Sequence, residues 1–234
     1  MIVILRGLVR MKAQAKLDLG QSISGLLLAL FLWVHLLLVS SILISHEAMA
    51  FVAHMMEAAF LTDSGEGYPV LVSIVALVIF ILIVIHAVLA MRKLPSNWRQ
   101  QQKLQQHAQL IPHKDTKNWR IQAMSGVAIM FLVPAHLFIM FAQPETIGPI
   151  ASSVRIESQG FWMLYLPLLI AAELHSTIGL YRLCIKWGWF TGNPADVARY
   201  RKTLNRLKQI ASAAFLLLGF LTLYTYYSIG AGLS

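Results

Sequence analysis

The sequence has 234 residues, of which 58% are hydrophobic and only 12% are charged, and its mean hydropathy is +0.67. Such a composition excludes an ordinary soluble domain and indicates a helical protein that crosses a membrane several times. The single cysteine, Cys184, excludes both an internal disulfide and a thiolate metal cluster within this chain.

Five apolar runs are long enough to cross a membrane as helices, because about 20 such residues span the hydrocarbon core. They cover residues 22–45, 69–91, 121–141, 161–181 and 209–229. The last run holds no histidine and no charge, so it is interpreted as a packing helix. Between the runs, residues 46–68 predict a short interfacial helix followed by a turn, and residues 94–119 predict a partly helical surface segment.

The net charge of +9 by itself would fit nucleic-acid binding. The basic residues, however, are distributed according to the predicted spans, nearly all on one side of the membrane. Four Lys and Arg residues lie in 1–21, seven lie in each of 92–120 and 182–208, and only Arg155 falls on the other side. The positive-inside rule places the N-terminus in the cytoplasm and the C-terminus in the periplasm of a bacterial inner membrane. We expect residues 1–21 to form an interfacial arm before a membrane domain at 22–230, with lipid or a docked protein, and no nucleic acid, as partners.

Each of the first four spans carries one deep histidine, and a rise of about 1.5 Å per residue gives its depth. His86 and His175 lie roughly 9–10 Å from the cytoplasmic edge, whereas His35 and His136 lie roughly 21–24 Å from it. The four side chains therefore form two layers, roughly 12–14 Å apart along the membrane normal. The predicted pairs are His86 with His175, and His35 with His136.

Two imidazoles from facing helices can hold one haem iron, so two matched layers predict two haems b stacked across the membrane. Basic residues suited to haem propionates share a helical face with the shallower ligands: Arg182 and Lys186 with His175, and Lys93 with His86. The alternative is that these histidines only form hydrogen bonds between helices, in a transporter or structural anchor without haem. Zinc is less suitable because the layers are too far apart for one closed site.

The predicted fold class is therefore an all-α membrane protein with five transmembrane helices. Four of them form a haem-binding bundle, the fifth packs against it, and the N-terminus is cytoplasmic.

Two carboxylates also lie among apolar residues. Glu173 is roughly 13 Å from the cytoplasmic edge, where a carboxyl group that gains and loses a proton suits a proton relay. Its alternative role is a hydrogen bond that braces a neighbouring helix. Glu57 lies in an apolar segment on the periplasmic side, where it could accept the proton released by quinol oxidation. Its alternative is an ordinary solvated surface position.

Several long stretches of the chain resemble one known family, the dihaem cytochrome b subunits of menaquinol:fumarate reductase, in the succinate:quinone oxidoreductase family. They are FLWVH at 31–35 with VSSIL at 39–43, HAVLAMRK at 86–93, WRIQAMSG at 119–126, QPETIGP at 143–149 and ELHSTIGLYR at 173–182. The resemblance extends over nearly the whole chain. It departs at Arg120, where the family typically has a second aromatic residue.

The resemblance implies two haems b and docking to an iron–sulfur subunit that carries a flavoprotein subunit. It implies that His86 and His175 hold the proximal haem, nearer the iron–sulfur subunit, and that His35 and His136 hold the distal haem. It further implies contacts to the proximal propionates from Gln21, Ser22, Trp119 and Lys186, and a contact near the distal haem from Arg155. Glu57 matches the family's menaquinol-site glutamate, and Glu173 matches the glutamate thought to carry compensating protons.

The predicted function is a membrane anchor that oxidises menaquinol near the periplasm and passes electrons through two haems to an iron–sulfur partner for fumarate reduction. The reverse direction, succinate oxidation with menaquinone reduction, is equally compatible with the residues. The cytochrome b anchor of a hydrogenase or formate dehydrogenase is a further alternative. Whether the complex forms a homodimer stays open.

Overall fold

The computed structural model describes residues 2–62, 66–95, 97–110, 114–190 and 196–233. The secondary structure of these residues is entirely helical. Among these described residues, five helices are long and apolar enough to cross a membrane, which confirms the predicted number of spans. They are α1 (Ile2–Val39), α3 (Pro69–Met91), α5 (Lys114–Ala142), α7 (Trp162–Trp187) and α8 (Val197–Ala231).

The predicted and observed spans differ mainly at their ends. The second prediction, 69–91, matches α3, but the other four helices extend beyond their apolar runs into charged sequence. Residues 2–21 are helical and continue into the span at 22 without interruption. Hydropathy shows where a helix is apolar, but not where its backbone hydrogen bonds end. The helical extensions beyond the apolar runs could therefore not be predicted from it.

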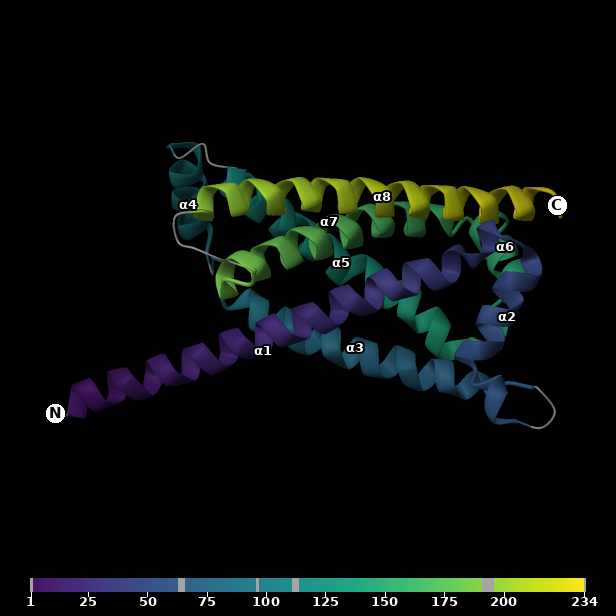
Figure 1. The fold of residues 1–234 in the computed structure, drawn as a ribbon. Helices are drawn as coiled ribbons and strands as arrows, with labels where there is room; N and C mark the ends of the chain where they lie inside the picture. Colours follow the sequence, from purple (N-terminus) through teal and green to yellow (C-terminus); the bar gives the residue numbers. More distant parts are fainter. Residues whose placement is uncertain (1, 63–65, 96, 111–113, 191–195, 234) are drawn as a thin grey trace.

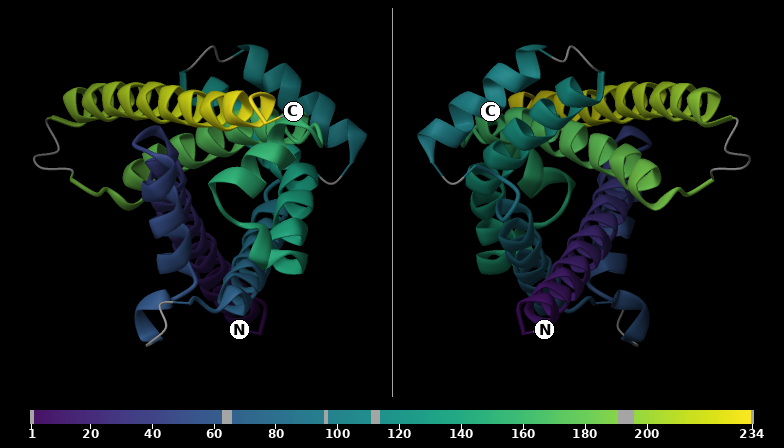
Figure 2. Two further views of the ribbon diagram at one scale, coloured as in Figure 1. Left: turned by 90° about the vertical axis from the view of Figure 1, so that its right-hand side faces the viewer. Right: turned by 90° about the vertical axis from the view of Figure 1, so that its left-hand side faces the viewer.

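Four of the spans surround a common centre. Contacts join α1 to α3, α3 to α5, α5 to α7, and α7 back to α1. The fifth span, α8, packs on α7 and to a smaller extent on α1, so it lies outside this ring. Figures 1 and 2 show α8 on the side of the molecule opposite α3. The packing role predicted for the last span agrees with this arrangement.

The two ends of the bundle carry different elements (Figure 1). One end, called here the α4 end, has α4 (Trp98–Leu110), the N-terminus and the beginning of α8. The other, called the α6 end, has α2 (His46–Met56), α6 (Pro149–Glu157) and the C-terminus. Because five spans join the two ends, the termini lie at opposite ends.

The α6 end is built from short helices. After α1 a 3₁₀ turn, Ser40–Leu43, leads into α2, and a second 3₁₀ turn follows at Ala59–Leu61. The helix predicted within 46–68 is therefore confirmed, as α2. A third 3₁₀ turn, Pro144–Thr146, precedes α6, which the sequence analysis did not anticipate.

Helix α6 packs tightly against α8 because of a glycine. A Cβ atom at Gly230 would lie 2.5 Å from the carbonyl oxygen of Ser153 and 2.6 Å from the Cβ of Glu157. Small residues allow such close helix contacts in membrane proteins. A polar contact, Ser40 Oγ to Thr222 Oγ1 at 2.8 Å, also joins the end of α1 to α8. These contacts attach both α6 and the end of α1 to α8 at the α6 end of the bundle.

Candidate functional site

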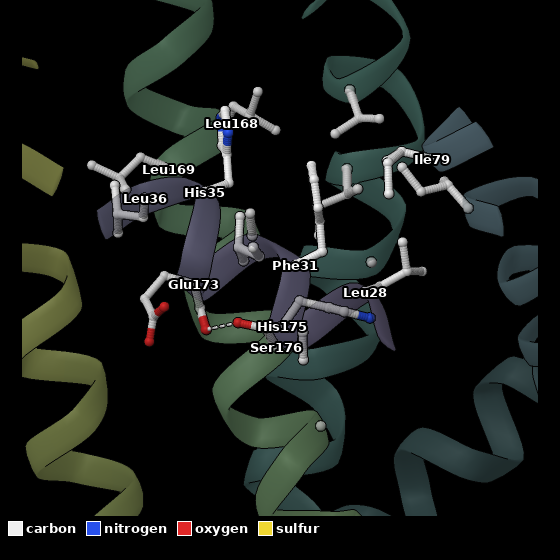
Figure 3. A pocket seen from close by; sticks show the side chains of 18 of the residues that line it. Leu28, Phe31, His35, Leu36, Ile79, Leu168, Leu169, Glu173, His175 and Ser176 are labelled. Atoms are coloured by element: carbon white, nitrogen blue, oxygen red, sulfur yellow. Dashed lines mark hydrogen bonds between the residues drawn. The ribbon is translucent and has the colours of Figure 1, made fainter. Parts of the chain in front are cut away.

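A large cavity runs along the centre of the four-helix ring. Its volume is about 1010 Å³, and residues from all five long helices line it. All four deep histidines are among the lining residues, and Figure 3 shows His35 and His175 within it. Most of the other labelled residues in this view are leucines, isoleucine and phenylalanine, so the wall is largely apolar. The volume is at the upper end of the range of about 300–1,000 Å³ that is common for ligand sites.

The structure brings the four histidines together in the two predicted pairs. The ring centroids of His86 and His175 are 6.3 Å apart, and the rings are perpendicular, at 89°. The centroids of His35 and His136 are also 6.3 Å apart, with the rings inclined at 52°. Among the described residues, no three His, Cys, Asp or Glu side chains come together as a metal site. The histidines therefore meet two at a time.

In the His86–His175 pair, each ring has a partner at Nδ1. His175 Nδ1 lies 2.9 Å from the carbonyl oxygen of Gln122, which can only accept, so Nδ1 carries the proton. His86 Nδ1 lies 3.0 Å from the hydroxyl of Ser24. The carbonyl partner fixes the tautomer of His175 and leaves its Nε2 unprotonated as a metal ligand. Ser24 Oγ donates to the carbonyl oxygen of Gln21 at 3.2 Å, so it can accept from His86 Nδ1 in the same way. Neither Ser24 nor the Gln122 carbonyl could be predicted from the sequence as a histidine partner, because both contacts depend on how each helix is rotated about its axis.

The His35–His136 pair has aromatic neighbours. His136 Nδ1 lies 3.5 Å from the Tyr165 hydroxyl, and the two rings meet edge to face with centroids 5.4 Å apart. The His35 ring stacks on Phe31, with centroids 5.6 Å apart. Contacts with these rings restrict the orientation of both imidazoles.

A glycine lies against each imidazole of the His86–His175 pair. A Cβ at Gly25 would lie 2.8 Å from Cε1 of His86, and a Cβ at Gly126 would lie 2.9 Å from Cε1 of His175. Real side chains do not approach this closely, so both positions need a residue without Cβ for the rings to keep their places. Each glycine thus gives the imidazole of a facing helix room to lie against the backbone.

Most residues predicted to contact propionates meet at the α4 end of the cavity. The lining residues there include Gln21, Ser22, Lys93, Trp119, Arg182 and Lys186. Lys186 Nζ donates to Ser22 Oγ at 3.1 Å, and Arg182 donates to the side chain of Gln122. This end of the cavity therefore presents several cations together with hydroxyl, amide and indole groups.

Arg155 lies in the opposite part of the cavity, on α6. Its side chain is buried, with 5% exposure, and it donates to the carbonyl oxygen of Thr146 at 3.0 Å and to the Thr146 hydroxyl. Within the described part of the chain, no carboxylate forms an ion pair with it. Buried charges are nearly always paired, so this guanidinium is suited to an anionic group in the cavity.

Glu173 is almost completely buried, at 1% exposure, and one carboxylate oxygen accepts from the Thr177 hydroxyl. Figure 3 shows its side chain and the His175 ring on opposite sides of α7. Residues two apart are about 200° apart around a helix, which explains this divergence. The other oxygen, Oε2, and the indole Nε1 of Trp33 are both buried and have no other hydrogen-bond partner among the described residues, and the Trp33 side chain interacts with this carboxyl group. The two polar groups inside this apolar packing therefore face each other.

Glu57 ends α2 and is also buried, with 8% exposure. The turn after it folds back, so that Tyr68 N donates to Glu57 O at 2.7 Å and a Cβ at Gly67 would lie 2.6 Å from Glu57 Oε2. His54 Nδ1 lies 3.8 Å from the same oxygen. Glu57 is not among the described residues that line the large cavity, although its neighbour Met56 is. The structure therefore does not bring Glu57 together with the histidine pairs.

Comparison with known proteins identifies the family. The model of the succinate dehydrogenase/fumarate reductase transmembrane subunit matches residues 98–224. The fumarate reductase cytochrome b subunit of Helicobacter pylori strain 26695 is 47% identical over 225 residues, which cover 96% of this chain and 85% of that protein. The fumarate reductase cytochrome b subunit of Wolinella succinogenes is 46% identical over 216 residues, or 92% of this chain and 83% of its own. The chain belongs to the family of succinate dehydrogenase/fumarate reductase transmembrane subunits.

Proposed function

We propose that this chain is the membrane-anchoring cytochrome b subunit of a quinol:fumarate reductase and that it holds two haems b. His86 and His175 would hold the iron of one haem, and His35 and His136 would hold that of the other. The identity of nearly one half to named fumarate reductase cytochrome b subunits supports the function. The observation that carries the haem assignment is the equal spacing of the two histidine pairs.

That spacing can be compared with the geometry of a six-coordinate iron. An imidazole–metal bond is about 2.0 Å long and the bonded nitrogen lies about 1.1 Å from its ring centre, so two axial rings have centres about 6.2 Å apart. The observed centroid distance is 6.3 Å in both pairs. Direct hydrogen bonding between two imidazoles, the alternative in a haem-free anchor, would bring the ring centres closer than this. The residues therefore fit two haems.

The rest of the cavity fits the same group. A haem has an apolar face and two carboxylate propionates, which need an apolar wall with cations at its ends. Lys93, Arg182 and Lys186 with Gln21, Ser22 and Trp119 would hold the propionates of one haem, and Arg155 those of the other. When bound, haem iron supplies one-electron transfer, with a potential that its surroundings adjust.

The two ends of the molecule then have different partners. The α4 end holds the basic loops, so the positive-inside rule makes it cytoplasmic, with the C-terminus periplasmic. We assign to this end the docking of an iron–sulfur subunit that carries a flavoprotein subunit, where fumarate is reduced. Residues 1–21 belong to this cytoplasmic side as an interfacial arm, and residues 22–230 form the membrane domain.

Menaquinol is oxidised at the other end, near Glu57. A carboxylate buried in an apolar surface can accept the proton that quinol loses on oxidation. Glu173, between the two layers, carries protons through the membrane. Support for this role is its almost complete burial at membrane depth beside only neutral partners, Thr177 and Trp33, because no cation among these contacts holds the carboxyl group in its charged form.

Two alternative functions can each be distinguished by experiment. Succinate oxidation with menaquinone reduction uses the same residues, and only the direction of net electron flow in the purified complex separates it. A hydrogenase or formate dehydrogenase anchor would co-purify with a different partner, and neither relative is named as one.

A pyridine haemochrome assay on the purified complex, with subunit stoichiometry, tests the proposal. We expect two b-type haems per copy of this chain. A content of one haem per chain would support only one of the two histidine pairs, and it would rule out electron transfer between two haem layers. A complex without haem would assign all four histidines to structural hydrogen bonds and overturn the proposal.

Adding one methyl group at Gly126 should disturb the haem that His175 holds. The new Cβ of Gly126→Ala would lie 2.9 Å from Cε1 and 3.1 Å from Nδ1 of His175, so the ring must move from its place. We expect loss or low-affinity binding of one haem, measured from the haemochrome content and the reduced-minus-oxidised spectrum. Gly20→Ala is the control, because its Cβ would meet only Leu89 Cδ1, at 3.4 Å. Equal haem content in both variants would contradict this packing argument.

A further inference from the structure

Asp18 lies on α1 at the α4 end, where it meets three cations from other segments. Lys93 Nζ is 2.9 Å and Arg92 Nη2 is 3.3 Å from Asp18 Oδ1, and Lys186 Nζ is 4.0 Å from Oδ2. Arg92 and Lys93 follow directly after α3, and Lys186 is in the last turn of α7. One carboxylate therefore connects α1, α3 and α7.

The backbone beside this carboxylate adds to the connection. Lys186 Nζ donates to the carbonyl oxygen of Asp18 at 3.2 Å and to Ser22 Oγ at 3.1 Å. Ser22 Oγ in turn donates to Asp18 O at 2.8 Å. The ammonium group of Lys186 is thus held against one turn of α1 by three contacts.

Asp18 also lowers the net positive charge of the group formed by Arg92, Lys93 and Lys186. Among the described residues, no other carboxylate forms an ion pair with Arg92, Lys93 or Lys186, while Asp115 pairs with Arg201. Lys93 and Lys186 line the cavity, but Asp18 is not among its lining residues. The carboxylate therefore contacts these ammonium groups from outside the cavity, and it offsets one of three positive charges.

We propose that Asp18 is a positioning residue that holds Lys93 and Lys186 at the cavity and lowers the reduction potential of the haem bound by His86 and His175. This rests on the proposed function. A negative charge near a haem makes the addition of an electron less favourable, and net charge is one of the factors that set haem potentials. The His35–His136 pair lies in the other layer, where the larger distance weakens the same effect.

Spectroelectrochemical titration of the purified complex tests this assignment. In Asp18→Asn we expect one of the two haem midpoint potentials to rise and the other to stay unchanged. Asp18→Glu, which keeps the charge, should stay close to the wild type. Lys93→Gln removes a positive charge at the cavity and should lower the same midpoint that Asp18→Asn raises.

Asp196→Asn is a matched control, because it removes an exposed carboxylate that pairs with Arg199, three residues further along the chain. It should move neither potential. Unchanged midpoints in Asp18→Asn, an equal rise of both, or loss of a haem without a rise would overturn the assignment. Haem content is measured in the same preparations: a wild-type complex with fewer than two haems contradicts the proposed function, whereas two haems with unchanged potentials contradict only the role of Asp18.

Discussion

Replacing His175 with alanine should remove one of two haems and stop electron transfer from quinol to fumarate. The imidazole is one of two in its layer, where it faces His86. Among the described residues, no third His, Cys, Asp or Glu side chain lies with this pair to take its place. Loss of a residue that only hydrogen-bonds a metal ligand lowers activity or metal affinity about 10–100-fold, so loss of the ligand itself should lower them at least that much. Haem content, the reduced spectrum and quinol-dependent fumarate reduction in the same preparation measure the effect.

The position of the lost haem gives a sharper test than activity alone. In His175→Ala the remaining haem should still be reduced by quinol, because the His35–His136 pair is intact, yet its electrons should not reach fumarate. In His136→Ala the remaining haem should not be reduced by quinol. His46→Ala is the control, since this exposed histidine in the first turn of α2 has no place in either pair. Two haems in His175→Ala would contradict the ligand assignment.

The histidine pairs could be predicted from sequence because depth along a helix is a linear function of residue number. A fixed rise placed His86 level with His175, and His35 level with His136, without knowledge of how the helices are rotated. Their hydrogen-bond partners could not be found in this way. The Gln122 carbonyl and the Ser24 hydroxyl belong to facing helices, and their contacts depend on the angle and separation of two helices.

Arg155 shows a different limit. By sequence it lies in a loop, but it belongs to α6, a helix of nine residues that begins at Pro149. Proline at the first helical position is a known signal, yet a segment this short shows little periodicity. It packs closely on α8, for which Gly230 leaves the space. Such tertiary contacts are invisible in a single sequence.

The opposite directions of the Glu173 and His175 side chains could have been predicted from the sequence, because positions two apart on a helix point in nearly opposite directions. A proton relay at Glu173 would therefore run on the side of α7 away from the His175 ring (Figure 3). Trp33 lies on that side, where it stacks on Phe215 of α8 with ring centroids 4.8 Å apart. A proton route through Glu173 and an electron route past His175 would thus use different faces of one helix.

Replacing Glu57 with glutamine should strongly slow quinol oxidation while both haems stay bound. Glutamine has nearly the same size and can keep the packing against Gly67, but it cannot accept a proton at neutral pH. A positioned general base contributes about 10²–10⁴-fold to a rate, and we expect a loss in that range. The measurement is the rate of haem reduction by a water-soluble menaquinol analogue. Haems reduced by dithionite serve as the reference for full reduction.

Two further measurements separate a chemical role of Glu57 from a structural one. Fumarate reduction with an artificial electron donor, which acts at the partner subunits, should be unchanged in Glu57→Gln. Glu47→Gln is the matched control, because Glu47 is an exposed glutamate in the first turn of the same helix. Glu57 lies outside the large cavity, so a lost quinol reaction with intact haem spectra would locate quinol beside α2 and not between the histidine layers. An unchanged quinol rate in Glu57→Gln would instead leave the cavity itself as the place where quinol meets the haem of His35 and His136.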